Sequence, residues 1–435
     1  MPLSILIVGC SVAGPALASF LQLAPFPPGQ RPRITVLERA PAVRNQGQNV
    51  DVRGVGAALL RKLGIEKAVK ASTTGEAGVQ WVTSAGHVWA QLGSASDGDT
   101  GQHNPTSDIE ILRGRMAQIL WKRSTTIAAA NAVEYIFGDH LDGIGQDHTT
   151  NTVTVHFARA GTKRTFDLVV GADGLLSSTR SMVWGPDHEA DCVRPLHMYA
   201  GFFSLPQDTA AGDCDFRRCY HTHGRRLLSI RPDKQNHRST ALLTVVNETD
   251  ERLAKAARGH GKTVVAAQKE LIREYFADAG WQAPRLVREM MASDDFYYSM
   301  VAQVKMATWH RGRVVLLGDA AHCASHLSGM GTTLALLGAY HLASSLARHA
   351  DDVETALAAY EADMRPHVDK AQKLMPCLLR ILSPATTWGV WLVDTTIRFL
   401  VWSRLFILVL LFNGPDADAE ALREDGFTQP PEYEE

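Results

Sequence analysis

A strand that ends in Gly318-Asp319 constrains the fold of this 435-residue chain more than any other segment. Residues 313–317 are mostly valine and leucine, which predicts a buried strand. Residues 329–332 (Gly-Met-Gly-Thr) then open an Ala- and Leu-rich stretch that predicts a long helix, 332–348. A strand that presents one carboxylate, followed by a glycine-rich helix start with free N–H groups, suits a ligand with a hydroxylated chain and an anionic edge.

The N-terminus has the pattern of a nucleotide-binding unit. An apolar run at 3–8 predicts a strand, and an apolar helix is predicted from Pro15. The turn between them has serine at the middle position of a Gly-x-Gly-x-x-Gly motif and carries the small residues Gly9, Ser11, Ala13 and Gly14. Such a turn lets a pyrophosphate lie over the helix N-terminus. A second predicted strand, 33–37, ends at Glu38-Arg39, where a carboxylate can accept the ribose hydroxyls of an adenosine. This unit alone does not separate FAD from NAD.

Further segments occur in the order typical of one known family. Residues 44–54 contain Arg44 and Asp51, residues 110–113 read Glu-Ile-Leu-Arg, and residues 167–174 end in Ala-Asp-Gly. Together with Gly-Asp-Ala-Ala-His at 318–322, they resemble the class A flavoprotein monooxygenases, which include aromatic hydroxylases and tetracycline-inactivating monooxygenases. The resemblance extends from residue 1 to about residue 375.

The resemblance implies FAD and NADPH as cofactors and assigns roles to individual residues. The Asp319 carboxylate would bind the ribityl hydroxyls, and Arg113 would reach the FAD phosphates or ribityl chain. In the family, Arg44 is associated with NADPH and Asp51 with FAD. Asp173 is credited with supporting both cofactors, although a carboxylate in such a turn can also cap the next segment. The predicted cofactor-binding residues are Gly9, Ser11, Ala13, Gly14, Glu38, Arg39, Arg44, Asp51, Arg113, Asp173, Asp319, Gly329, Gly331 and Thr332.

The order of predicted elements indicates an α/β fold. Short apolar runs between turn residues in the middle of the chain predict an antiparallel sheet. We expect a discontinuous Rossmann-like FAD-binding domain (1–185 and 295–375) with an inserted antiparallel β-sheet domain for the substrate (186–294). A C-terminal region of apolar helices and an acidic tail (376–435) completes the predicted fold.

The family resemblance also implies a reaction. NAD(P)H would reduce FAD, and the reduced flavin would trap O2 as a C4a-hydroperoxyflavin that hydroxylates or epoxidises a small apolar, aromatic or enolic secondary metabolite. Two alternatives stay open on the sequence. One is a flavin-bearing cyclase or isomerase that works without net oxidation, and the other is a protein that sequesters a metabolite without reaction.

The loop before the predicted flavin helix departs from the family pattern. Relatives usually carry prolines between the Gly-Asp-Ala-Ala motif and the next glycine. This chain has Cys-Ala-Ser-His-Leu at 323–327 instead, so the loop is less rigid and carries a titratable ring at His326. His326 could donate a proton, bind substrate or remain a solvated loop residue, and it is our candidate catalytic residue.

Composition limits the remaining functions. A formal net charge of −2 supplies no basic face for nucleic acid. The six scattered cysteines are typical of reduced thiols, and together with the absence of a basic leader they predict a cytoplasmic protein. Cys214, Cys219, His221 and His223 lie close together in sequence, but compact metal sites usually draw paired ligands from two segments, so we expect no metal. The sequence leaves the oligomeric state open.

The C-terminal region is apolar and rich in tryptophan. Residues 388–412 contain three tryptophans, but charged residues leave only 405–412 as an unbroken apolar run, short of the ~20 residues of a membrane span. We expect helices packed on the flavin domain, with peripheral membrane contact through 388–412 as the alternative. Residues after Asn413 are acidic and contain proline, which predicts a disordered end.

Overall fold

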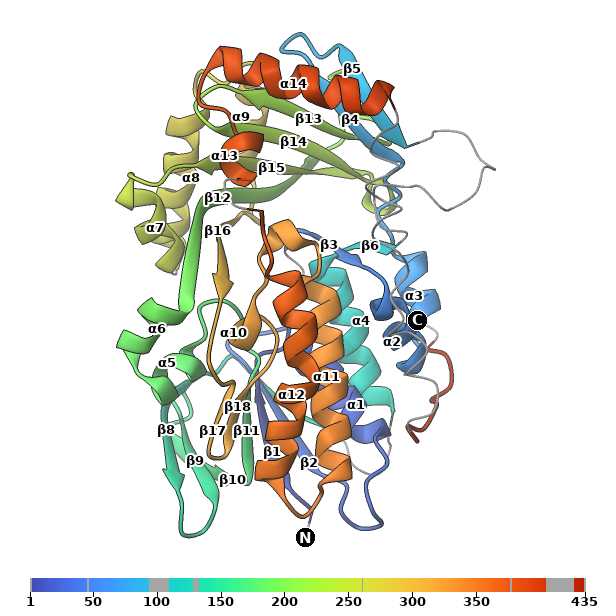
Figure 1. Cartoon of the computed structure of the whole chain (residues 1–435), viewed down its shortest axis with the longest axis vertical. Helices are drawn as coiled ribbons and strands as arrows, with labels where there is room; N and C mark the ends of the chain where they lie inside the picture. Colours follow the sequence, from blue (N-terminus) through green and yellow to red (C-terminus); the bar gives the residue numbers. More distant parts are fainter. Residues whose placement is uncertain are drawn as a thin grey trace.

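The computed structural model describes seven stretches of the chain. They are residues 2–44, 47–93, 109–127, 133–259, 261–375, 378–403 and 426–433. Figure 1 shows two parts stacked along the long axis of the molecule, one built on a largely parallel sheet and the other on an antiparallel sheet. The predicted α/β fold class is confirmed.

The first part is built on a six-stranded sheet in the order β17-β18-β11-β1-β2-β7, in which all neighbours are parallel except β17 and β18. Its strands are β1 (Ser4–Val8), β2 (Arg33–Glu38), β7 (Glu134–Phe137), β11 (Leu168–Gly171), β17 (His310–Arg311) and β18 (Val314–Leu316). The central strands are buried on both faces, which explains their nearly continuous apolar sequences.

Helices cover one face of this sheet, and a small sheet covers the other (Figure 1). The helices of this part are α1 (Ala13–Leu23), α2 (Val55–Lys62), α3 (Glu66–Ala71), α4 (Arg113–Thr126), α10 (Asp319–His322), α11 (Gly331–Arg348) and α12 (Val353–Ala371). The antiparallel sheet on the opposite face consists of β8 (Leu141–Asp147), β9 (Thr152–Phe157) and β10 (Thr162–Phe166). Two short helices, α5 (Ser178–Trp184) and α6 (Pro186–Cys192), lead into the second part.

The second part is built on a seven-stranded sheet in the order β16-β12-β15-β14-β13-β4-β5. Its strands are β4 (Gly78–Val82), β5 (Val88–Gly93), β12 (Val193–Pro206), β13 (Arg217–Thr222), β14 (Arg226–Asp233), β15 (Arg238–Val246) and β16 (Tyr297–Val304). Only β13 and β4 pair in parallel. A one-turn helix η1 (Lys234–Asn236) joins β14 to β15, and α7 (Glu251–Arg258), α8 (Lys262–Phe276) and α9 (Ala283–Ala292) cover one face of the sheet.

The second sheet draws strands from outside the predicted substrate domain of 186–294. β4 and β5 come from the predicted first segment, 1–185, and β16 comes from 295–375. They join this sheet because their hydrogen-bonding partners are β13 and β12. The predicted boundaries are therefore wrong at these three strands.

A two-stranded sheet lies between the two parts (Figure 1). It pairs β3 (Asn49–Val52) with β6 (Ile109–Leu112). The loop after α10 contains one further turn, η2 (His326–Ser328).

The C-terminal helices pack on the second sheet, so the prediction that they pack on the flavin domain is wrong. They are α13 (Leu378–Leu382) and α14 (Thr387–Trp402), and Figure 1 shows α14 lying across β13 and β4 at the end of the molecule. His221 of β13 holds α14 through a 2.9 Å contact between its Nδ1 and an Asp394 carboxylate oxygen. Trp388, Trp391 and Trp402 are exposed. The apolar run 405–412 lies outside the described residues, and no helix in the described stretches is long and apolar enough to span a membrane.

Residues 426–433 pack against the first part of the molecule, which contradicts the predicted disordered end for this stretch. The Phe427 ring lies 5.0 Å from that of Tyr340 on α11 and 6.0 Å from that of Phe20 on α1, measured between centroids. The backbone N–H of Tyr433 donates to the Gly64 carbonyl across 2.7 Å. Aromatic burial therefore outweighs the acidic, proline-containing composition of this stretch.

Candidate flavin site

The turn after β1 is built by two glycines that no other residue can replace. Gly9 has a φ of 115°, and a Cβ there would lie 2.4 Å from the Ala172 carbonyl oxygen. A Cβ at Gly14 would lie 2.0 Å from the Gly9 carbonyl oxygen. The helix α1 begins at Ala13, and no side chain of a described residue caps its N-terminus. Its first N–H groups are therefore available to an anionic ligand.

Glu38 closes one side of this turn from the end of β2. Its carboxylate accepts the backbone N–H groups of Cys10 and Ala40, each across 2.9 Å. The Nε of Arg44 lies 3.8 Å from the same carboxylate, with about half of the Arg44 side chain exposed. Arg39 is exposed. The turn and the predicted ribose acid are thus adjacent, with two arginines near the opening.

The second glycine motif lies against the first. Gly318 has a φ of 64°, and a Cβ there would be 3.3 Å from the Cβ of Ala13, so the end of β18 adjoins the start of α1. Asp319 follows as the first residue of α10 and is half-buried. The fully buried Arg180 donates to the carbonyls of Ala320 across 2.8 Å and Leu175 across 2.7 Å, which fixes α10 to the segment after β11.

Arg113 connects the predicted flavin segments. Its Nε donates to the Ser11 hydroxyl across 3.2 Å, and its backbone N–H donates to the Gln48 carbonyl across 3.0 Å. A Cβ at Gly47 would lie 3.1 Å from the Cβ of Arg113, so the 47–51 segment lies directly beside this arginine. Asp51 lies within that segment and pairs with Arg53 across 2.8 Å.

Asp173 acts as a helix cap in this structure. Its carboxylate accepts the hydroxyls of Ser177 (2.5 Å), Ser178 (3.1 Å) and Thr179 (3.0 Å), and also the Thr179 backbone N–H (2.9 Å). These donors lie at the N-terminus of α5, where a negative charge is favourable. The contacts of the Asp173 side chain are therefore those of a residue that caps a helix. Its backbone packs on Gly9, which is how it supports the site in this structure.

The loop between α10 and α11 reaches the second sheet. Ser325 has a φ of 78°, an unusual conformation for a serine, and the next residue is His326. The His326 ring is exposed toward Phe202 of β12, with 6.3 Å between the ring centroids. Desolvation by the surrounding protein lowers the pKa of His326, Asp319 acts in the opposite direction and Arg113 lowers it further. His326 is therefore neutral at pH 7 and lies between the flavin segments and the sheet.

The start of α11 completes the site. Gly329 has a φ of 62° and lies against the guanidinium of Arg53. A Cβ at Gly331 would have no described atom within 4 Å, so the helix start is open on that side. Thr332 is buried one residue further on. The structure thus brings the predicted residues of α11, α10, α4 and the β1 turn to one region.

One ionic cluster beside this region was not predicted. Arg231 of β14 pairs with Glu76 across 2.8 Å and also contacts the carboxylate of Glu110 on β6. Glu110 accepts a hydrogen bond from Asn49 of β3 across 2.5 Å. Burial raises the pKa of Glu76, and the Arg231 charge opposes that rise. The cluster ties the two parts together, and no local sequence pattern marks Arg231 because its partners are more than 100 residues away.

The alternative of a metal site receives no support from the described residues. No group of three or more potential ligands is found among them. His221 is held by Asp394 across 2.9 Å, and the Cys219 sulfur lies 3.6 Å from the Ser229 hydroxyl.

Comparisons with known proteins agree with this geometry. Residues 3–374 match the family described as FAD binding domain. The chain is 35% identical to the FAD-dependent monooxygenase asL6 of Sarocladium schorii over 383 residues, which cover 86% of this chain and 87% of that protein. It is 31% identical to the monooxygenase CTB7 of Cercospora beticola, with 94% of each chain covered. Among solved structures, the tetracycline destructase Tet(51) superposes with a TM-score of 0.72 at 28% identity, covering 92% of this chain and 98% of that one.

Proposed function

The chain belongs to the FAD-binding-domain family of class A flavin monooxygenases, and we propose that it uses NAD(P)H and O2 to oxygenate a small apolar, aromatic or enolic secondary metabolite. The observation that carries the proposal is the meeting of two glycine motifs at Gly318 and Ala13, with Arg113 beside them.

The residues fit FAD. Gly9 and Gly14 leave no room for side chains in the turn, and the start of α1 has N–H groups available for a pyrophosphate. Glu38 would hold the adenosine ribose, Asp319 the ribityl hydroxyls, and the open start of α11 the flavin ring edge. When bound and reduced, FAD supplies the activation of O2.

The sheet face next to His326 supports an apolar or enolic substrate. Along the sheet, Ser229, Leu242, Phe202 and Tyr297 occupy one row of paired positions. Their neighbours Ile230, Leu243 and Phe203 belong to the core under α7, α8 and α9, so the row faces the opposite side, toward the His326 loop. This side offers an apolar floor to a planar molecule.

Positive charge at the end of this floor supports a substrate that carries an enolate oxygen. The guanidinium of Arg217 donates to the Ser229 hydroxyl across 3.1 Å, whereas Arg231 on the neighbouring strand is already paired with Glu76 and Glu110. Tet(51), a tetracycline destructase by name, has a related fold. A polycyclic enol is therefore the first substrate class to test.

In the proposed reaction the protein positions the substrate, keeps water away and supplies a proton. A ring nitrogen of His326 would donate or accept that proton, because the ring lies beside Phe202 of the proposed substrate floor. Arg44 would meet NAD(P)H, since its guanidinium is partly exposed near the nucleotide turn.

The experiment is turnover of candidate enols with NADPH or NADH under 18O2. One labelled oxygen atom in the product, with matching loss of reduced nicotinamide, is the expected result. Product without oxygen uptake or nicotinamide oxidation would indicate the cyclase or isomerase alternative. Tight binding of a metabolite without any product would indicate sequestration.

A further inference from the structure

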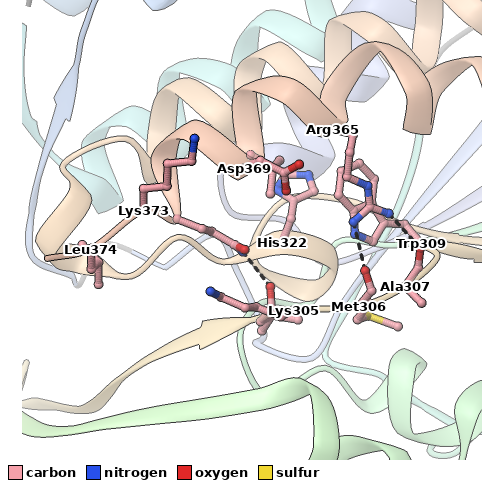
Figure 2. A pocket seen from close by; sticks show the side chains of 12 residues that line it. Lys305, Met306, Ala307, Trp309, His322, Arg365, Asp369, Lys373 and Leu374 are labelled. Atoms are coloured by element: carbon pink, nitrogen blue, oxygen red, sulfur yellow. Dashed lines mark hydrogen bonds between the residues drawn. The ribbon is translucent and has the colours of Figure 1, made fainter. Parts of the chain in front are cut away.

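A cavity lies beside His322 at the end of α10. It has a volume of about 550 Å³ and is lined by the chain between β16 and β17, by α10 and by the end of α12. That volume falls within the roughly 300–1,000 Å³ typical of small-molecule sites. Figure 2 shows Lys305 and Lys373 at one end of this cavity, the Arg365–Trp309 pair at the other, and His322 between them.

The inner wall contains two buried polar atoms that lack partners. His322 and Trp309 are each 1% exposed, and their rings lie 4.8 Å apart between centroids. Neither the His322 Nε2 nor the Trp309 Nε1 has a hydrogen-bond partner among the described residues. A buried polar group left without a partner costs about 1–3 kcal/mol, so a polar atom of a bound molecule would be stabilised there.

The outer end of the cavity carries positive charge. Lys305 and Lys373 are exposed and have no salt-bridge partner in the described part of the chain, and Asp369 is the single acid that lines the cavity. Arg365 is already engaged, because it donates to the Met306 and Ala307 carbonyls and pairs with Glu361. Two ammonium groups and one carboxylate therefore line this end of the cavity.

We propose that this cavity binds a small organic anion whose carboxylate or phosphate contacts Lys305 and Lys373 and whose apolar body extends toward Trp309 and His322. Val304, Val368 and Leu374 supply apolar lining for that body. This ligand class excludes a bare inorganic ion, because such an ion would leave the apolar wall and the inner polar atoms without contacts.

The cavity wall is connected to the His326 loop by hydrogen bonds. The Gln372 side chain donates to the carbonyls of Val304 across 2.7 Å and Cys323 across 3.1 Å. Gln303 donates to the Ala324 carbonyl across 3.3 Å and the Gln372 carbonyl across 3.0 Å. An anion bound in the cavity would therefore stabilise the segment that leads to Ser325 and His326, and it would raise the thermal midpoint of the protein.

The test is calorimetric titration of the FAD-loaded protein with benzoate, phenyl phosphate and uncharged benzamide. We expect one site for at least one of the two anions and no measurable binding of benzamide. The anion that binds with the higher affinity identifies the preferred head group, carboxylate or phosphate. FAD fills its own site but leaves the proposed substrate floor open, so the position of the bound anion is decided by the variants below.

Charge-removing variants locate the site. The double variant Lys305→Gln/Lys373→Gln should weaken anion binding about tenfold or more, since it removes two charge-assisted contacts. The matched control Lys255→Gln/Lys262→Gln removes the same charge from exposed positions on α7 and α8 and should bind like the wild type. The flavin spectrum checks that each variant is folded. Absence of anion binding, or equal loss in both double variants, overturns the proposal.

Discussion

Arg113 donates a hydrogen bond from its Nε to the hydroxyl of Ser11 across 3.2 Å, which ties the start of α4 to the nucleotide turn 102 residues earlier in the chain. Gly47 packs on the aliphatic part of the same arginine, so three separate segments meet at one side chain. Replacement of Arg113 by Gln should lower FAD affinity about ten- to a hundredfold, because a hydrogen bond to a charged group is worth ~1.5–3 kcal/mol. Quenching of FAD fluorescence on titration of the apoprotein measures this loss.

Arg115 provides the matched control for that variant. It lies on the same helix but donates to the Ser72 hydroxyl across 3.2 Å instead of the nucleotide turn. Arg115→Gln should retain near-normal FAD affinity. Equal losses in both variants would mean that the stability of α4, and not the contact with the cofactor, explains the effect.

Asp319→Asn should also weaken FAD binding, by about tenfold or more, because a neutral amide is a weaker acceptor for ribityl hydroxyls than a carboxylate. Asp351→Asn is the control, since Asp351 is exposed. Within the described stretches, its carboxylate accepts a hydrogen bond only from the Gln30 side chain. The fraction of FAD retained after gel filtration distinguishes the two. Full retention by Asp319→Asn would contradict the assigned role.

His326→Gln should retain the flavin spectrum while lowering turnover and raising the fraction of nicotinamide oxidation that ends as peroxide. The reason is that glutamine keeps polarity at the loop but cannot exchange a proton near neutral pH. His148→Gln, in an exposed turn, is the control. Peroxide and product measured in one reaction test this, and unchanged coupling in His326→Gln removes the histidine from the chemistry.

Stability should fall in mildly acidic solution because of buried histidines. Burial lowers the pKa of His322 and of His341 from 6.5 to about 4, with Asp319 and Asp363 respectively acting in the opposite direction. A histidine whose pKa is depressed on folding contributes stability above its unfolded pKa, and that contribution is lost as the pH falls from 6.5 toward 4. Each histidine should cost up to about 1.4 kcal/mol per pH unit within this window.

Urea unfolding between pH 7 and pH 4.5 measures that slope. His341→Gln removes one of the titrating histidines and should make the slope shallower, whereas the exposed-turn variant His148→Gln should leave it unchanged. A slope independent of His341 would assign the acid sensitivity to other groups.

The C-terminal stretch 426–433 should contribute to the stability of the flavin domain. Phe427→Ser removes an aromatic contact with Tyr340 and Phe20 and should cost about 1–2 kcal/mol for a half-buried ring. Thr428→Ser is the control, because Thr428 donates its backbone N–H to the Leu23 carbonyl, and this hydrogen bond does not depend on the side chain. Chemical denaturation of both variants provides the measurement, and an unchanged midpoint for Phe427→Ser would show that the tail contributes nothing.

Much of the flavin site could be predicted because its parts are encoded in short contiguous segments. The turn at Gly9 to Gly14 is marked by a six-residue motif, in which a Cβ at Gly14 would meet the Gly9 carbonyl. The Gly318-Asp319 turn is marked by the apolar strand before it. The sequence does not assign a role to Asp173, because the same Ala-Asp-Gly motif is compatible with an acid that binds a cofactor and with one that caps a helix. Only its four hydrogen bonds to α5 distinguish the two.

The amino-acid sequence by itself determined the family, the fold class and the two glycine motifs, since backbone sterics and strand–turn–helix patterns act between neighbouring residues. Tertiary structure alone decided which sheet β4, β5 and β16 join, where α14 and the tail pack, and how Arg231 meets Glu76 and Glu110. These outcomes depend on pairings between residues far apart in the chain. Burial and charge favour one such pairing over others only when distant segments come together in space.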